Sequence, residues 1–151
     1  MAITIKNADV LVKLTKEKLD QIENRLKAVL DDEILAIQLR TRQGKDVDGA
    51  DFKKYTPAYA KFRSEGRVTR DGKRVGGGRR AHPPDLTYKG DMLRAMKVKI
   101  QKLADKTLGI IEFNSALEAA KASGNQLRRK FFGFSEEQKQ RITRKLIGDD
   151  K

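Results

Sequence analysis

The chain has 151 residues and a formal net charge of +13, and its lack of cysteine excludes disulfides and thiolate-bound metal ions. Hydrophobic residues make up 38% and charged residues 36% of the sequence, which favours one domain with a small core and segments that contribute nothing to it. So large a positive charge favours an acidic partner, such as nucleic acid, an anionic membrane or an acidic protein surface, although a soluble protein with many solvated lysines has the same composition.

The N-terminal part predicts a short strand followed by a long helix. Residues 2–6 alternate with Ile3 and Ile5 on one face, as in a strand. Asn7 and Asp9 are candidate helix caps. From about residue 9 to 41, apolar residues recur at steps of three and four, which predicts an amphipathic helix, and Asp31-Asp32 mark where so long a helix could break. Its apolar stripe contains Leu19, Ile22, Leu26, Val29, Leu30, Ile34 and Ile37.

Residues 41–63 predict a loop and then a short helix, with Gly44 as the end of the long helix. The sequence D-V-D-G at positions 46–49 predicts a turn and resembles part of a calcium loop, but Tyr55 stands where the EF-hand pattern requires glutamate. We therefore expect no calcium site. Thr56-Pro57 predicts a helix start. Three aromatic side chains would share one face of this helix: Tyr55, Tyr59 and Phe62.

The segment from about residue 63 to 85 predicts a flexible or hairpin-like basic loop. It is rich in glycine, and Val68 and Val75 are its only apolar side chains between the cations. The single histidine, His82, has no second histidine or cysteine with which to bind a metal ion. The cations of the loop are Arg63, Arg67, Arg70, Lys73, Arg74, Arg79 and Arg80.

The C-terminal half predicts a short helix, a β-hairpin and two further helices. A helical face of Leu86, Met92, Leu93 and Met96 starts near Gly90. Residues 97–103 and 107–113 alternate as the strands of an antiparallel hairpin, with its turn at Asp105-Lys106. An alanine-rich helix covers residues 115–123 and ends at Gly124-Asn125.

The last helix begins with a capping box, because Ser135 is followed three residues later by Gln138. It carries Ile142, Leu146 and Ile147 and ends at Gly148. The order of these elements predicts an α+β fold: a small antiparallel sheet packed by a long N-terminal helix and shorter helices, with a flexible basic loop. We expect residues 1–151 to form a single domain.

The sequence offers no recognisable catalytic constellation. His82 lies in a flexible glycine- and proline-rich context, where no nucleophile is positioned beside it. The carboxylate pairs are adjacent in sequence, and adjacent residues on a helix do not face each other. We therefore expect no enzyme, no cofactor and no metal, although distant acidic residues could still form a nuclease site. The pairs are Asp31-Asp32, Glu136-Glu137 and Asp149-Asp150.

The sequence also indicates where the chain is made. No stretch reaches the roughly 20 apolar residues of a membrane span. The N-terminal residues MAITIKNADV lack the apolar run of a signal peptide. We expect no membrane partner and synthesis in the cytoplasm.

Three segments share patterns with one protein family. DGADFKKYTPAYAKFR at 48–63 is similar to a dG-x-x-W-x-P-L-S-x-x-T segment, YKGDMLRAM at 88–96 to a TGxL helix start, and RKFFGFS at 129–135 to an RPFLGLS element before a C-terminal helix. In this order they resemble the phage virion morphogenesis proteins, which are tail-completion (head–tail joining) proteins. With the N-terminal helix, the segments span most of the chain. Three residues depart from the pattern: Phe52 replaces tryptophan, Lys89 threonine and Lys130 proline.

The resemblance implies a structural virion protein of the neck, a ring-forming tail-completion or tail-terminator subunit that joins the tail tube to the portal side. Related rings usually contain six copies, so it implies a homo-oligomer of that kind. The implied partners are adjacent neck or connector proteins and tail-tube proteins, in a virion assembled in the host cytoplasm. The residues implied as family-motif or interface positions are Gly90, Leu93, Arg129, Phe131, Phe132 and Gly133.

In such a ring, the basic loop would line a lumen near packaged DNA or bind an adjacent ring, through sequence-independent, salt-sensitive contacts. A solvated loop that binds nothing is the alternative for this segment. For the whole protein, the alternative is a small basic nucleic-acid-binding protein without sequence specificity, and a ribosome-associated protein is a third hypothesis. No recognition helix or zinc module indicates base readout.

The sequence RRKFFGFS at 128–135 holds half of the phenylalanines of the chain. Phe131 and Phe134 are three residues apart and can face one side across a bend at Gly133. Phe134 also precedes the Ser135 cap, where it can staple the last helix. We interpret the segment as a core plug, that is, a segment whose phenylalanines fill part of the core and fix the C-terminal helix. The alternative is that Phe132 is exposed to a neighbouring subunit.

Overall fold

The structure is a computed structural model that describes residues 3–6, 16–87, 89–103 and 107–147. The α+β prediction is confirmed. One antiparallel sheet has the strand order β1-β5-β4, and a second, two-stranded sheet pairs β2 with β3. In chain order the elements are β1 (Ile3–Lys6), α1 (Lys16–Arg42), α2 (Pro57–Glu65), β2 (Arg67–Val68), β3 (Arg74–Val75), α3 (Asp91–Arg94), β4 (Met96–Lys102), β5 (Thr107–Phe113), α4 (Ala116–Gln126) and α5 (Glu136–Ile147).

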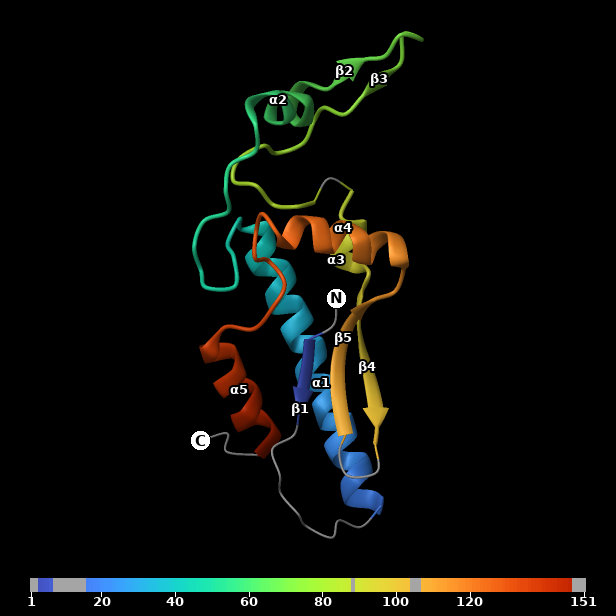
Figure 1. Cartoon of the computed structure of the whole chain (residues 1–151), viewed down its shortest axis with the longest axis vertical. Coiled ribbons are helices and arrows are strands. Elements are labelled where there is room, and N and C mark those ends of the chain that lie inside the picture. The colour runs from blue at the N-terminus through green and yellow to red at the C-terminus, as the bar shows by residue number, and fades with distance from the viewer. Residues whose placement is uncertain (1–2, 7–15, 88, 104–106, 148–151) are drawn as a thin grey trace.

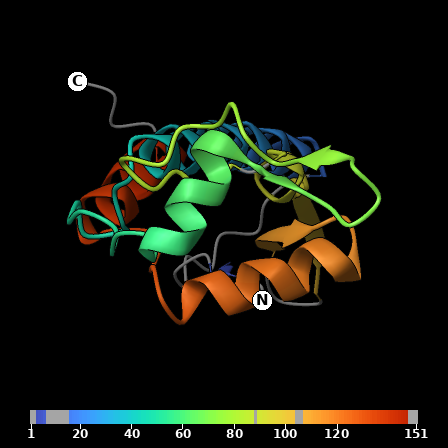
Figure 2. The same cartoon turned by 90° about the horizontal axis from the view of Figure 1, so that it is seen from above.

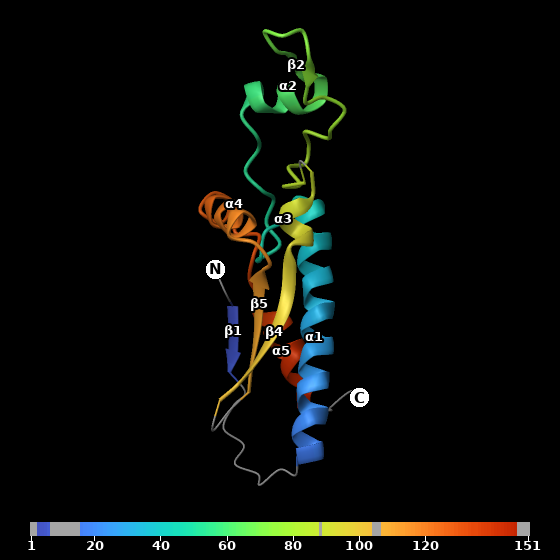
Figure 3. The same ribbon diagram turned by 90° about the vertical axis from the view of Figure 1, so that its right-hand side faces the viewer.

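The molecule consists of an elongated body and a projecting arm (Figure 1). In the body, α1 runs along the three-stranded sheet, with α5 beside it and α3 and α4 at one end (Figures 1 and 3). The arm, defined here as residues 57–80, contains α2 and the β2–β3 hairpin and extends beyond that end of the body. The basic segment of the sequence therefore stands apart from the core.

The core lies between α1 and one face of the sheet. Leu26, Leu30 and Ile37 of α1 are fully buried, as the apolar stripe predicts. On the sheet, Val98 pairs with the buried Ile111, so the two strands of the hairpin present the same alternating face to α1. The turn at residues 105–106 and the caps Asn7 and Asp9 lie outside the described residues.

The helix α1 does not break at Asp31-Asp32, contrary to one expectation from the sequence. It continues unbroken from Lys16 to Arg42. Asp31 accepts a hydrogen bond from Lys27 one turn earlier, and Asp32 pairs with Lys145 of α5. Both carboxylates therefore form surface ion pairs on a continuous helix, which leaves the backbone hydrogen bonds intact.

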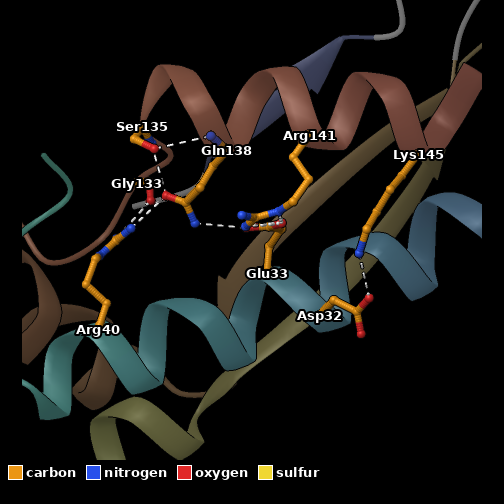
Figure 4. Close-up of polar contacts among 8 residues, drawn as sticks. All are labelled: Asp32, Glu33, Arg40, Gly133, Ser135, Gln138, Arg141 and Lys145. Carbon is orange, nitrogen blue, oxygen red and sulfur yellow. Dashed lines mark hydrogen bonds and ion pairs between the residues drawn. The ribbon is translucent and has the colours of Figure 1, made fainter. Parts of the chain in front are cut away.

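A buried polar network fastens α5 to α1 (Figure 4). The carboxylate of Glu33 is 1% exposed and accepts hydrogen bonds from Arg141 at 2.8 Å and from Gln138 at 2.8 Å. The predicted capping box is confirmed, because Gln138 N donates to Ser135 Oγ and Ser135 N donates to Gln138 Oε1. Gln138 thus caps α5 and anchors it to α1 at the same time.

Two element ends differ from the sequence prediction. The helix after Gly90 is only one turn long, and Met96 begins β4 instead of ending that helix. The alanine-rich helix α4 continues through Gly124 to Gln126. Asn125 stabilises this end, since its side-chain Nδ2 donates to Lys121 O one turn earlier.

Gly109 of β5 is a point of close contact between the sheet and α1. A Cβ at this position would lie 2.4 Å from Leu30 Cδ1 and 3.0 Å from Leu26 Cγ. We expect Gly109→Ala to lower the free energy of unfolding by about 1–3 kcal/mol, because the added methyl group overpacks the core. Urea denaturation measures the change.

Gly124→Ala in α4 is the matched control, since no atom lies within 4 Å of its added Cβ. Alanine has the higher helix propensity, so this variant should gain about 0.5–1 kcal/mol. Equal effects of the two substitutions would contradict the packing of α1 against β5.

Candidate partner and nucleic-acid interface

The arm is fixed to the body by a buried arginine. Arg63 of α2 is 1% exposed, and its Nη2 donates to Asp85 Oδ1 at 2.8 Å. Its Nε donates to Arg80 O at 2.8 Å, and its guanidinium lies 5.0 Å from the centre of the Tyr55 ring. The expectation that Arg63 faces DNA or a partner is therefore wrong. Its charge is paired inside the protein, where it positions the arm.

The basic segment forms a hairpin that is bonded to the end of α2. The amides of Gly66 and Gly77 both donate to Phe62 O, and the amide of Gly78 donates to Ser64 O. Gly76 has a φ of +75°, and a Cβ at this residue would lie 2.5 Å from the Phe62 ring. A residue with a side chain cannot occupy that position without displacing the ring, so this glycine is needed for the compact arm.

The arm concentrates positive charge. Residues 57–80 contain eight cations and two carboxylates, a net charge of +6 out of +13 for the whole chain. Arg67 lies over the Phe62 ring at 5.7 Å, and Arg74 donates to Glu65 O at 2.8 Å, so both side chains are held in place from within the arm. The exposed cations of the predicted set are Arg67, Arg70, Lys73, Arg74, Arg79 and Arg80.

Arg80 combines exposure with a structural role. Its Nε lies 3.9 Å from Asp85 Oδ2, and its Nη2 donates to Arg42 O at the end of α1. It therefore joins the arm to the body while one side of it faces solvent. Four cations, Arg67, Arg70, Lys73 and Arg74, belong to the outer part of the arm and are exposed.

A groove of about 1270 Å³ lies where the arm meets the body. One wall comes from the segment before α2 and from α2 itself, and the other from α4, which lies at the same end of the molecule (Figure 2). The loop before α3 and residues 127–129 complete it. The lining residues are Lys53, Lys54, Tyr55, Thr56, Tyr59, Arg63, Leu86, Lys89, Gly90, Asp91, Met92, Leu117, Glu118, Lys121, Asn125, Leu127, Arg128 and Arg129.

The groove contains residues from all three segments that carry the family resemblance. Tyr55 comes from the first segment, Gly90 from the second and Arg129 from the third. Arg129 links the third to the first, because its Nε donates to Lys53 O at 3.0 Å and its guanidinium lies 4.8 Å from the Tyr55 ring centre. Residues as far as 76 positions apart in sequence, Lys53 and Arg129, thus meet at one surface.

Burial changes the titration of two groups in the groove. Burial raises the pKa of the Tyr55 hydroxyl above its usual value, and the charge of Arg63 opposes this shift. Burial also lowers the pKa of the Arg129 guanidinium. The Tyr55 hydroxyl also accepts a hydrogen bond from the amide of Leu86 at 3.2 Å. These shifts mark a partly desolvated, packed centre between arm and body.

Three predicted interface residues are buried inside the body. Leu93 and Phe131 are 0% exposed and Phe132 is 3% exposed. The alternative that Phe132 faces a neighbouring subunit is therefore wrong, because its ring packs 5.3 Å from Phe113 and its amide and carbonyl both bond to Gln126. The prediction of a core plug is confirmed for Phe131 and Phe132, and Phe134 is half-buried against the same core.

Arg40 of α1 holds the plug in place (Figure 4). Its Nη2 donates to Phe131 O at 2.8 Å and to Gly133 O at 3.1 Å, and its Nη1 donates to Gln138 Oε1 at 2.7 Å. The bend at Gly133 thus presents its carbonyl to Arg40. Of the predicted motif positions, Gly90 and Arg129 line the groove, and the others serve the core.

Sequence reasoning missed the second wall of the groove. Leu117 and Leu127 are 65% and 89% exposed at the two ends of α4. Both fall outside the apolar face of that helix, where Ala122 is buried. A leucine on the polar face of an amphipathic helix is the signal that would have identified this surface.

Neither a metal site nor a membrane helix emerges from the described part of the chain. Over residues 3–6, 16–87, 89–103 and 107–147, no group of three or more histidine, aspartate or glutamate side chains could hold a metal ion. None of the helices described there has the length and apolar character to cross a bilayer.

Comparisons with protein-family models, with curated proteins and with solved structures found no match.

Proposed function

We propose that this chain is a non-enzymatic structural subunit of a phage neck, a ring-forming tail-completion or tail-terminator protein that joins the tail tube to the portal side. The observation that carries the proposal is the meeting of the three family-like segments at one groove. A hydrogen bond and a cation–π contact of Arg129 with Lys53 and Tyr55 join the third segment to the first, and Gly90 of the second segment lines the same groove. A surface composed of the segments that resemble the family is the part of the molecule where a shared docking role is expected.

The arm supplies the second part of the proposal. The arm, residues 57–80, projects from the body with a net charge of +6 and reaches beyond the subunit's own core. In a ring, it would contact packaged DNA or an acidic surface of the next ring, and its cations would neutralise phosphates without reading sequence. The ring is a homo-oligomer, with six copies as in related rings, and its place is the virion neck after assembly in the host cytoplasm.

Deletion of the gene from the genome that encodes it tests this role. The proposal predicts DNA-filled heads and separate tails that do not join, seen by electron microscopy of the lysate. Supplying the protein from a plasmid should restore complete particles. Normal yields of joined, infectious particles without the protein would overturn the proposal.

A nucleic-acid-binding protein that acts outside a particle is the second candidate, and the charge of the arm favours it. Arg67, Arg70, Lys73 and Arg74 are all exposed and lie within eight residues. Sequence-independent binding through such a cluster weakens as salt rises. A stable monomer that binds duplex DNA at physiological salt, together with normal particle assembly in the deletion strain, would favour this candidate.

Replacing these four arm cations with serine separates the contribution of the arm to DNA binding from the contribution of the protein's net charge. We expect the salt dependence of duplex-DNA binding to become weaker. The magnitude of the slope of log association constant against log salt concentration should decrease by about 3–4, because each phosphate contact contributes about 0.9. The control removes four exposed cations from the body, Arg25, Lys27, Lys99 and Arg144. An equal loss in both variants would show that the arm has no special role in binding.

A further inference from the structure

We propose that the groove between α2 and α4 binds an acidic amphipathic helix of a partner protein. This inference does not rest on the proposed function, because it concerns the chemistry of the groove and not the particle in which the chain works. The exposed leucines at the α4 wall, Leu117 and Leu127, carry the first part of the argument. Burying a leucine side chain contributes about 1.5–3 kcal/mol, so covering both would stabilise a complex substantially.

The shape of the groove favours a helix as the occupant. Thr56 caps α2 and Tyr59 lies in its first turn, and both side chains are exposed in the groove. Leu117, Lys121 and Asn125 come from successive turns of α4. Two helices that each present one face to a shared groove offer the ridges against which a third helix packs.

The charge on the rim favours acidic side chains on that helix. Lys53, Lys54, Lys89 and Arg128 are all exposed around the groove. The two carboxylates of the lining are already paired within the protein: Asp91 with Arg94 at 2.5 Å and Glu118 with Lys121 at 2.6 Å. The groove therefore presents uncompensated positive charge beside the exposed leucines Leu117 and Leu127, and glutamate or aspartate on the flanks of an apolar stripe complements both.

A protein partner fits the groove better than single-stranded nucleic acid. Binding of unpaired bases relies on open aromatic faces. The guanidinium groups of Arg63 and Arg129 already lie over the Tyr55 ring, and Tyr59 packs edge-on against it at 5.0 Å. Of the remaining apolar surface, Leu117 and Leu127 are 65% and 89% exposed against 38% for Tyr59, and leucine packs against leucine and methionine side chains and has no stacking role.

The test uses purified full-length protein and a fluorescently labelled synthetic peptide of about 18 residues, which is five turns of helix. Its leucines recur at positions i, i+3, i+4 and i+7, and glutamate fills the flanks. The comparison ligands are a peptide of the same composition in scrambled order and an oligothymidine strand. We expect the patterned peptide to bind at least about tenfold more tightly than the scrambled one, since the scrambled peptide cannot place two leucines against Leu117 and Leu127 together.

Two groove variants should each weaken binding of the patterned peptide by about tenfold or more: Leu117→Ser with Leu127→Ser, and Lys89→Glu with Arg128→Glu. Matched controls carry the same changes elsewhere on the surface, Leu35→Ser with Leu39→Ser on α1, and Arg25→Glu with Arg144→Glu. The controls should change the affinity by less than about twofold.

Failure of the patterned peptide to bind, equal binding of the scrambled peptide, or equal effects of groove and control variants would overturn the proposal. Binding of oligothymidine that is lost in the leucine variant would also overturn it, because the groove would then be a nucleic-acid site. None of these results bears on the gene deletion, so the two proposals fail separately.

Discussion

Phe131→Ala is expected to lower the free energy of unfolding by about 3–5 kcal/mol, the cost typical of truncating a buried phenylalanine. Phe131 is 0% exposed and its ring lies 6.1 Å from that of Phe132, within the core that α1 shares with the sheet. Its carbonyl is fixed by Arg40, so the surrounding backbone cannot collapse freely into the cavity. Urea denaturation followed by circular dichroism measures the loss.

Leu127→Ala is the control for this prediction. Leu127 lies four residues earlier but is 89% exposed, so its truncation should change the free energy of unfolding by less than about 0.5 kcal/mol. A loss below about 1 kcal/mol for Phe131→Ala would show that residues 131–132 are not a core plug.

Asp85→Ala is expected to release the arm from the body. The substitution leaves the guanidinium of Arg63 buried without its carboxylate, and breaking a buried ion pair in this way costs about 3–5 kcal/mol. Arg63 donates to Arg80 O and its own carbonyl accepts from the amide of Arg79, so its displacement should first open residues 77–79 locally. We expect amide hydrogen exchange at Gly77, Gly78 and Arg79 to accelerate by about a hundredfold or more.

Two further variants test whether faster exchange in Asp85→Ala comes from the unpaired charge of Arg63. Asp71→Ala removes a carboxylate from the exposed hairpin turn and should leave exchange in the arm unchanged. Replacing both partners, Arg63→Met with Asp85→Leu, should restore part of the protection, since no buried charge remains unpaired. Unchanged exchange at these amides in Asp85→Ala would contradict the assigned role of the pair.

The fold was largely predictable from local pattern. The stripe that contains Leu26, Leu30 and Ile37 specified α1, and alternation specified β4 and β5, because each repeat matches the geometry of its element. The cap residues Thr56 and Ser135 specified where α2 and α5 begin. The continuity of α1 at Asp31-Asp32 could not be predicted from that local pair, since Leu30 and Ile34 on either side are buried in the core and Asp32 pairs with Lys145 far away in sequence.

The candidate site was predictable only in part, because its key contacts are non-local. Arg63 has the same local context as the exposed arginines of the arm, and only the approach of Asp85 from 22 residues away makes it a buried anchor. Phe132 is buried because Phe113 and Gln126 meet it from other elements. The groove appears only when the arm, α4 and residues 127–129 come together.

The two parts of the molecule have separate tasks. The body is a packed scaffold in which Arg40 and Glu33 bind the C-terminal segment to α1. The arm carries the positive charge, and the pair of Arg63 with Asp85 sets its position above the groove. Docking through groove and arm is the role we propose for the protein in the assembled neck.

Analysis of purified infectious particles tests the central claim most directly. A map of the intact particle, with mass spectrometry of its proteins, should contain this chain as a ring between the portal and the tail tube, with the arm against DNA or an adjoining ring. Complete infectious particles that contain none of the protein would contradict the account.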